Sequence, residues 1–285
     1  FTPPAPGKLS MGLARVRGTP PAIEGENIGS DAECAEGHGA HGRKASGMLM
    51  VDGVLYMWVR NANLNGEHSH LAWSLDHART WRWADWRFEE FGYCTFLNFG
   101  RNYAGARDDY VYVFSHDHPS AYVAADRMIL MRARKDRLAD RSAYEFFAGK
   151  SSGERPVWCT DVAQRAAVFT HPGRCLRSGV SYDAPLKRYL WWQQIPKRPA
   201  GDTRFDGGFG VYDAAEPWGP WTCVYYTECW DVGPGETGSF PAKWMSAEGK
   251  TVHLVFSGDD SFAVRRAELT TASQAAQPSP GGAQP

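Results

Sequence analysis

The chain has 285 residues, a formal net charge of −1 and 13% aromatic residues, with 30 Gly and 18 Pro. The balanced charge argues against a general nucleic-acid binder, which carries a basic excess, and no apolar run reaches the ~20 residues of a membrane-spanning helix. Many aromatic residues between many turn residues favour an all-β protein with short strands.

The N-terminal stretch FTPPAPGKLS lacks the charged-then-apolar layout of a signal peptide. We expect a secreted or periplasmic protein whose signal peptide is not in this chain. At the other end, residues 272–285 (ASQAAQPSPGGAQP) are low in complexity and predict a disordered tail or linker. Residues 1–271 are then a single domain.

Four stretches of the chain share one layout: an apolar strand, a turn, an aromatic-rich second strand, a polar loop and a third strand. They span residues 44–76, 95–136, 174–221 and 239–269, and their second strands contain VLYMWV, YVYVF, RYLWW and TVHLVF. These segments are too short and too rich in β-branched and aromatic residues for helices. A repeated sheet of this kind predicts the blades of a β-propeller, with a β-sandwich as the alternative.

The start of the chain refines the number of blades. KLSMGLARVRG, residues 8–18, resembles the third strand of the other units and has no inner strands before it. We therefore predict a five-bladed propeller whose first blade is incomplete in this chain.

Antiparallel pairing within a blade places the loop that enters the innermost strand and the loop that leaves the second strand on one face. Polar residues gather in these loops, and we expect this face to carry the chemistry. Crowded cations in a concave funnel suit an anionic or polyhydroxylated ligand. The acids in the short turns of the other face cap those turns; they are Asp52, Asp108, Asp109, Asp183 and Glu248.

The catalytic candidates on this face are three acids and two histidines. Glu236 precedes an innermost strand, and Asp259 and Asp260 follow a buried strand; glycoside hydrolysis needs paired carboxylates, one protonated and one ionised. His116, in SHDHPS, and His171, in THPGRC, are acid or base candidates. A solvated loop is the alternative for each of them.

The sugar-holding candidates are Lys44, Arg60, Asn61, Asn98, His118, Arg174, Arg177, Gln193 and Lys243. Four aromatic residues near the same loops either stack on sugar rings or belong to the core: Trp58, Tyr122, Trp191 and Trp192.

No motif identifies a cofactor or a metal site. A zinc site at His171, Cys175 and Cys159 would have irregular spacing, so we assign no metal ligand and leave a structural or catalytic divalent cation as an option. The six cysteines lack a C-x-x-C pair and are compatible with disulfides or free thiols.

The stretch SLDHARTW, residues 74–81, resembles the Asp-box of sialidase-type propellers, S-x-D-x-G-x-T-W, with Ala78 in place of its glycine. The resemblance implies a structural turn between outer strands, remote from the active site. Asp76 then accepts backbone N–H groups, Thr80 returns a hydrogen bond, and Trp81 packs between blades.

Two further segments are similar to five-bladed arabinanase-like glycosidases: GGFGVYDAAEPWGPWT to an outer-blade segment and FPAKWMSAEGKTVHLVFSG to the last blade. Across about residues 44–269 the chain looks most like bacterial propeller proteins grouped with endo-arabinanases. This resemblance implies a glycoside hydrolase. Such enzymes often carry an essential acid on the innermost strand of the first blade, a strand that this chain lacks.

Our main expectation is a glycoside hydrolase that binds a poly- or oligosaccharide in a central funnel, without nucleic-acid or membrane partners. The first alternative is a polysaccharide lyase. In a lyase a His or Tyr residue abstracts the proton beside a uronate carboxylate and a cation neutralises that carboxylate; the candidates are His116, His118, His171, Tyr93 and Arg174. The second alternative is a propeller that binds a glycan without cleaving it.

Overall fold

The computed structural model describes residues 11–34, 39–197, 207–231, 235–258 and 261–271. Within these ranges the chain forms short strands joined by turns and 3-10 helices, with no α-helix. The all-β prediction is therefore confirmed. None of the helices described is long and apolar enough to cross a membrane.

The strands form sheets that follow one another along the chain. The first is the hairpin of β1 (Leu13–Thr19) and β2 (Ala22–Ile28). The second contains β3 (Lys44–Val51), β4 (Val54–Arg60), β5 (Ser69–Ser74) and β6 (Arg82–Phe88). The third contains β7 (Thr95–Asn98), β8 (Tyr110–His116), β9 (Ala125–Arg134), β10 (Glu145–Lys150) and β11 (Pro156–Cys159), and β12 (Ala167–Cys175) also pairs with β9.

The remaining sheets complete the described chain. One contains β13 (Ser178–Asp183), β14 (Arg188–Pro196), β15 (Gly207–Ala214) and β16 (Thr222–Thr227). The last contains β17 (Gly235–Ser239), β18 (Thr251–Gly258) and β19 (Ser261–Glu268). Single-turn 3-10 helices of the described chain span Gly39–His41, Arg101–Tyr103, Lys135–Arg137, Arg141–Ala143, Val162–Gln164 and Ala242–Trp244.

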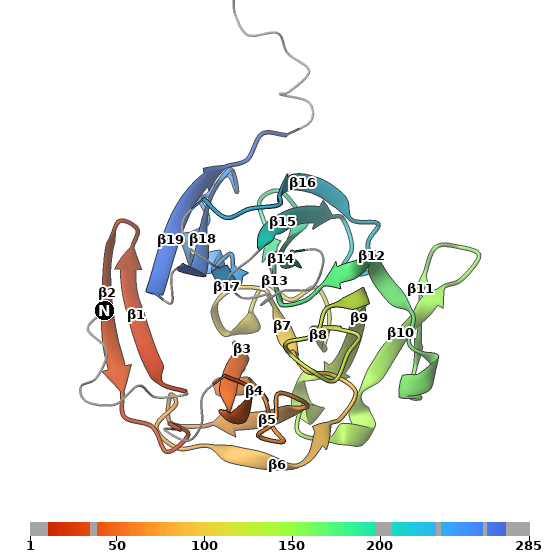
Figure 1. Ribbon diagram of the computed structural model, residues 1–285. Coiled ribbons are helices and arrows are strands. Elements are labelled where there is room, and N and C mark those ends of the chain that lie inside the picture. The colour runs from red at the N-terminus through yellow and green to blue at the C-terminus, as the bar shows by residue number, and fades with distance from the viewer. Residues whose placement is uncertain (1–10, 35–38, 198–206, 232–234, 259–260, 272–285) are drawn as a thin grey trace, which may run out of the picture.

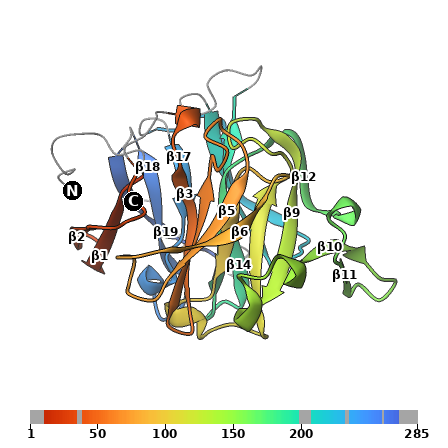
Figure 2. The ribbon, with the colours of Figure 1, turned by 90° about the horizontal axis from the view of Figure 1, so that it is seen from below.

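The sheets surround a common centre, and β3, β7, β13 and β17 lie nearest to it (Figure 1). Neighbouring strands within each sheet are antiparallel, whereas the innermost strands β7 and β13 pair in parallel at Leu97↔Val180 and Asn98↔Ser181. The β1–β2 hairpin lies between the β17–β19 sheet and the β3–β6 sheet. In the side view it projects on the flank opposite the β10–β11 hairpin (Figure 2).

Two glycines let the innermost strands approach one another. A Cβ atom on Gly179 of β13 would lie 2.3 Å from the carbonyl oxygen of Gly238 in β17, and one on Gly47 of β3 would lie 2.9 Å from Cα of Thr95 in β7. Since real Cβ atoms do not approach other atoms so closely, a side chain at either position would push the inner strands apart.

The hydrophobic core fills the spaces between sheets. Consecutive residues of β14 point to opposite faces, so Trp191 packs toward the β7–β12 sheet and Trp192 toward the β17–β19 sheet. Trp58 packs with Phe88 and Phe96. These three tryptophans are fully buried. They belong to the core and do not form sugar-stacking surfaces.

The turn between β5 and β6 has the contacts that its sequence predicts. The backbone N–H and hydroxyl of Thr80 donate to Asp76 over 2.9 and 2.7 Å, and the Ser74 hydroxyl donates to the same carboxylate. These bonds, led by the backbone N–H of Thr80, lower the pKa of Asp76 to about 2. Trp81 packs against the hairpin, beside Met11 and Leu13. Asp76 therefore holds a turn at the outer strands.

One strand boundary differs from the sequence prediction. The repeat pattern begins its third unit at Arg174, as an innermost strand. In the structure Arg174 and Cys175 end β12, and Cys175 pairs with Ala125 of β9 in the preceding sheet. The innermost strand of the third unit begins at Ser178.

Candidate active site

An axial pocket of about 320 Å³ lies between the innermost strands. Its lining includes Tyr93, which precedes β7, Thr95 of β7, Gly179 of β13 and Thr237 of β17. The Tyr93 hydroxyl and the Thr237 hydroxyl are 2.7 Å apart and form a hydrogen bond across the pocket. Residues from sheets that are far apart in the sequence therefore meet at the axial pocket.

The β3–β4 hairpin brings two cations and an amide to the same end of the pocket. Lys44 begins β3 and pairs with Arg60, the last residue of β4. Asn61 follows directly and adopts a left-handed conformation, with φ of 59°. Its side-chain nitrogen lies 2.7 Å from the carbonyl oxygen of Gly42 and 3.1 Å from that of Gly39, so these carbonyls fix its orientation.

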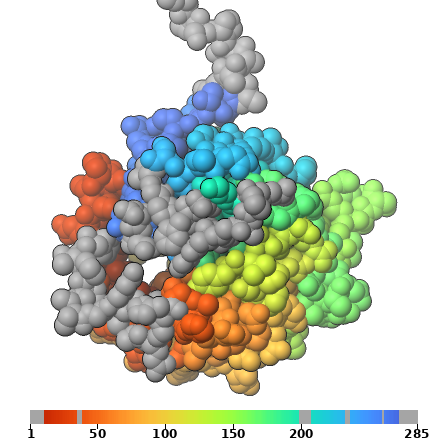
Figure 3. Space-filling view, in the orientation of Figure 1, coloured from red at the N-terminus to blue at the C-terminus, as the bar shows by residue number. Residues whose placement is uncertain are grey.

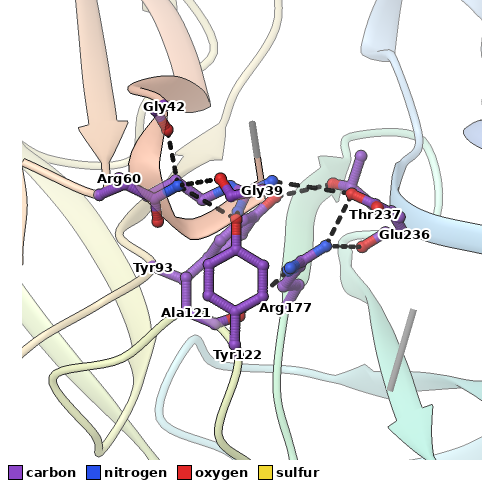
Figure 4. Close-up of polar contacts among 10 residues, drawn as sticks. Gly39, Gly42, Arg60, Tyr93, Ala121, Tyr122, Arg177, Glu236 and Thr237 are labelled. Carbon is purple, nitrogen blue, oxygen red and sulfur yellow. Dashed lines mark hydrogen bonds and ion pairs between the residues drawn. The ribbon is translucent and has the colours of Figure 1, made fainter. Parts of the chain in front are cut away.

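Arg177 and Glu236 form an ion pair at the mouth of the pocket (Figure 4). Arg177 has no exposed surface, and its Nη1 lies 2.9 Å from a Glu236 carboxylate oxygen. Arg60 reaches the same oxygen over 3.7 Å. Burial, followed by the charge of Arg60, lowers the pKa of Arg177 to about 10, so Arg177 stays charged at neutral pH. Two guanidinium groups thus favour the ionised form of Glu236.

Tyr122 projects its phenol into this group, between Arg60 and Arg177 (Figure 4). Its oxygen accepts hydrogen bonds from Arg60 Nη1 over 2.9 Å and from Asn61 Nδ2 over 3.1 Å. The guanidinium carbons of Arg60 and Arg177 lie 5.3 and 5.2 Å from the ring centroid. Partial burial opposes ionisation of the phenol, but Arg60, Asn61, Lys44 and Arg177 outweigh it and lower the pKa of Tyr122.

Positive charge exceeds negative charge in this group, which we call the axial site: Lys44, Arg60, Asn61, Tyr93, Tyr122, Arg177, Glu236 and Thr237. Three cations face one carboxylate. The Lys44 side chain makes no hydrogen bond or ion pair with another described residue, and burial is the main reason that its pKa is lowered. Among the described residues, Arg177 Nη2, Arg60 Nε and the Asn61 carbonyl are buried without a hydrogen-bond partner. The site can therefore accept an anionic, hydrogen-bonding ligand.

The two histidines of SHDHPS brace the loop that carries Tyr122. His116 is fully buried, and its Nε2 lies 2.7 Å from the Ser120 carbonyl oxygen. The Ser120 N–H donates to Nδ1 of His118 over 2.9 Å. Burial lowers the pKa of His116 to about 4, so it is neutral at pH 7. Both histidines are thus bonded to the backbone of the loop that carries Tyr122.

His171, Arg174 and Gln193 lie outside the axial site. Arg174, on β12, donates to the Tyr226 hydroxyl over 3.0 Å and pairs with Glu228. The Gln193 amide donates to the Arg174 carbonyl oxygen. The ring of His171 lies 6.2 Å from that of Tyr226. With Tyr226, these candidates form a second polar group, on β12, β14 and β16.

Asn98 and Lys243 lie farther along the innermost strands than Lys44 and Glu236, although Asn98 also lines the axial pocket. Asn98 ends β7, and its side chain accepts from the Gly100 N–H. Lys243 donates to the Val16 carbonyl oxygen of the hairpin over 2.8 Å. Both line a cavity of about 850 Å³, together with Met48 and Met50. The reason is topological: only the first residues of an innermost strand reach the face that carries Lys44 and Glu236.

Other predicted positions have simpler outcomes. Asp259 and Asp260 lie outside the described residues. The turn acids Asp108 and Asp183 accept from backbone N–H groups of Tyr110 and Leu186, as predicted. All six cysteines are described and are free thiols. In the described ranges no cluster of three or more His, Cys, Asp or Glu residues is arranged to hold a metal ion.

The sequence underestimated Tyr122, which it marked only as a stacking candidate. The position of Tyr122 in the sequence did point to the site. It lies in the loop that leaves the second strand of its sheet, and such loops were expected to lie on the face that carries the chemistry. The tyrosine that the sequence offered for catalysis was Tyr93, whose hydroxyl is hydrogen-bonded with Thr237.

Neither a protein-family model nor a curated protein matches this sequence. Its fold does match solved structures. A proposed exo-β-1,3-galactanase from Bifidobacterium bifidum s17 matches with a TM-score of 0.54 and 10% identity, over 93% of this chain and 81% of that one. The GH43_1 enzyme from Xanthomonas citri, complexed with xylose, matches with a TM-score of 0.50 and 13% identity, over 92% and 80%. At these identities the likeness concerns the fold alone: the chain has the propeller-like fold of these glycosidases.

Proposed function

We propose that the protein is a five-bladed β-propeller in which the β1–β2 hairpin is the outer part of the first blade. Each of the other sheets contributes one strand to the centre, and the hairpin occupies the remaining place around it (Figure 1). In the space-filling view an opening lies between the hairpin and the middle of the molecule (Figure 3). Packing of Leu13 and Ile28 toward Trp81 supports a fixed position for the hairpin.

We further propose that the axial site cleaves the glycosidic bonds of an acidic glycan by hydrolysis. The observation that carries this proposal is the surplus of cations around Glu236: Lys44, Arg60 and Arg177 face a single carboxylate at the mouth of the axial pocket. A ligand carboxylate would offset that surplus and use the donors of Arg60 and Arg177 that lack partners among the described residues. The shared fold with glycosidases supports hydrolysis as the reaction.

Glu236 fits the ionised member of a hydrolytic carboxylate pair. Its two guanidinium neighbours stabilise the charged form, which is suited to attack or to stabilising positive charge on the sugar, and unsuited to donating a proton. Asp259 and Asp260 remain acid/base or nucleophile candidates on the sequence argument alone. A polymeric glycan as substrate also agrees with the proposed secreted or periplasmic location.

Tyr122 favours a second candidate reaction, β-elimination from a uronate. A phenol that accepts hydrogen bonds from Arg60 and Asn61 is a base, and Arg177 or Lys44 would neutralise the substrate carboxylate while the neighbouring carbon loses its proton. The same acidic glycan serves both reactions, and the products differ.

The test is to incubate the protein with polygalacturonate and oligoglucuronates, and with arabinan, xylan and galactan as neutral glycans. We expect new reducing ends from an acidic glycan, and a loss of about 100-fold or more in Glu236→Gln. The control is Glu216→Gln, which removes an exposed ion pair with Arg107 and should leave the rate unchanged.

Three outcomes would replace the proposal. Ultraviolet absorbance of an unsaturated uronate would identify elimination. Cleavage of neutral glycans alone would refute the acidic substrate. Binding of a glycan without any product, in wild type and variants alike, would identify a non-catalytic glycan-binding protein.

A further inference from the structure

We propose that Tyr122 is the catalytic base of the axial site, the residue that removes a proton as the glycan is cleaved. The inference rests on the proposed function and goes beyond it, because neither the candidate acids nor the candidate histidines then carry out this step. It depends on two observations: the hydrogen bonds to the phenol and the charges that face it.

The hydrogen bonds leave the Tyr122 oxygen as an acceptor. Arg60 Nη1 donates to it, and a guanidinium group has no acceptor to receive the phenol hydrogen. Asn61 Nδ2 faces the carbonyls of Gly39 and Gly42, which fixes this atom as a donor toward Tyr122 as well. Neither Arg60 nor Asn61 therefore accepts the phenol hydrogen. The deprotonated Tyr122 oxygen keeps both hydrogen bonds.

The charged groups around the phenol come from four elements. Arg60 ends β4, Lys44 begins β3, Arg177 precedes β13, and Glu236 lies in β17, held by the two arginines. Tyr93 lies beneath Arg60, with 5.9 Å between the guanidinium carbon and the ring centroid. The surplus of positive charge stabilises a phenolate, in agreement with the lowered pKa of Tyr122. The raised pKa values of Tyr103, Tyr112, Tyr189 and Tyr212, which come chiefly from burial, set Tyr122 apart.

The other nearby bases already have partners. Glu236 forms ion pairs with Arg177 and Arg60. His116 uses Nε2 on the Ser120 carbonyl inside the core, and His118 accepts from the Ser120 N–H. Asp117 pairs with Arg127 and Arg165. The Tyr122 oxygen differs from these groups because its two hydrogen-bond partners, Arg60 and Asn61, both act as donors toward it.

The proton transfer follows from this arrangement. In hydrolysis the phenolate takes a proton from a water molecule while the water oxygen bonds to the anomeric carbon and the glycosidic C–O bond breaks. The departing oxygen takes a proton from solvent, and the phenol later returns its own proton to solvent. In elimination the phenolate would instead take the proton beside the carboxylate, and that electron pair would form a double bond as the C–O bond breaks.

An acidic substrate would also increase the basicity of Tyr122. A carboxylate bound to Lys44, Arg60 or Arg177 offsets the positive charge that stabilises the phenolate. The phenolate would then bind a proton more strongly than in the free protein, whereas a neutral sugar would leave its basicity unchanged. Binding of galacturonate should therefore be accompanied by proton uptake at a pH where Tyr122 is ionised.

The experiment uses Tyr122→Phe, which removes the oxygen and keeps the ring. The matched control is Tyr225→Phe on the exposed strand β16, whose side chain is half exposed. Tyrosinate absorbance is followed through an alkaline titration, and kcat and KM are measured across pH on the acidic glycan. A second variant, Lys44→Met, removes one facing charge without touching the phenol.

We expect wild type and Tyr225→Phe to show a tyrosine that ionises ahead of the others, and Tyr122→Phe to lack it. We expect kcat to fall about 100- to 10,000-fold in Tyr122→Phe with KM nearly unchanged. Lys44→Met should fold normally and shift both the early titration and the rising, acidic limb of the pH profile to higher pH, because the base must be ionised to act.

Two results would overturn the role of Tyr122 while leaving the proposed function intact: normal kcat in Tyr122→Phe, or a wild-type titration without an early tyrosine. Failure of the proposed function has a different signature, because then wild type releases no product from any acidic glycan. If Tyr122→Phe unfolds at a different temperature from wild type, Lys44→Met provides the test instead. An unchanged pH profile and an unchanged tyrosine titration in Lys44→Met would also refute the proposal.

Discussion

His116 shows how a single residue can support the axial site without touching a ligand. Its ring is fully buried and bonds the Ser120 carbonyl, and the next residue of that loop, Ala121, accepts from Arg177 Nε over 3.2 Å. Tyr122 follows directly. The sequence identified His116 as an acid or base candidate because histidine titrates near neutral pH. In the structure His116 is buried, which no motif reveals, and it holds the loop in position through Ser120.

The buried imidazole predicts a pH dependence of stability. The pKa of His116 is about 4 in the folded protein, with burial as its largest cause and His118, Arg177 and Asp117 as facing charges, against about 6.5 in an unfolded chain. Between these values the unfolded state binds a proton that the folded state excludes. Stability is therefore intact above about pH 6.5 and falls by roughly 3 kcal/mol as pH decreases through 4.

Urea unfolding at several pH values measures this effect as the difference between wild type and His116→Gln. The variant should lose much of the slope between pH 6.5 and 4. His77→Asn, a control on the exposed turn after β5, should keep it. Identical slopes in wild type and His116→Gln would contradict the assignment.

At the scale of elements, register decides which residues reach the axial site. Lys44 and Arg60 are partners across β3 and β4, and Gly235 at the start of β17 pairs with Gly258 at the end of β18. Alternation and antiparallel pairing were enough to predict the convergence of Lys44, Arg60, Arg177 and Glu236. Asn98, the last residue of the four-residue strand β7, lines both the axial pocket and the cavity farther along the innermost strands.

The close approach of the innermost strands gives a prediction for β13. Gly179→Ala would place a methyl group against the Gly238 carbonyl and the Ser239 side chain. Since backbone cannot yield as a flexible side chain does, we expect the free energy of unfolding to fall by about 1–3 kcal/mol. Gly153→Ala is the matched control, because the nearest atom, in Arg155, is 4.0 Å away. Equal unfolding midpoints for both variants in urea would contradict this packing.

At the scale of the whole molecule, the β1–β2 hairpin covers apolar surface of the next sheet. Met57, Val59 and Ala72 are fully buried in the cluster that contains Met11, Leu13 and Trp81. The hairpin forms few backbone hydrogen bonds with the other sheets, since β1 and β2 pair only with each other in the described structure. Side-chain burial is therefore its main attachment.

A chain that begins at Gly39 tests this attachment. Without residues 1–38 the faces of β4 and β5 that carry Met57, Val59 and Ala72 would meet water. We expect a lower thermal unfolding midpoint and increased binding of a hydrophobic dye. Unchanged unfolding would show that the hairpin is dispensable for the rest of the fold.

The sequence by itself determined the all-β class, the repeated sheets, the turn at Asp76 and most cations of the axial site. These follow from local rules: strand periodicity, turn chemistry and the alternation of faces. Only the tertiary structure decided that Trp58, Trp191 and Trp192 are core, that His116 braces a loop, and that the Tyr122 oxygen lies between Arg60 and Asn61. The physical reason is that burial and charge proximity depend on contacts between segments far apart in the chain, and a pattern within one segment does not carry them.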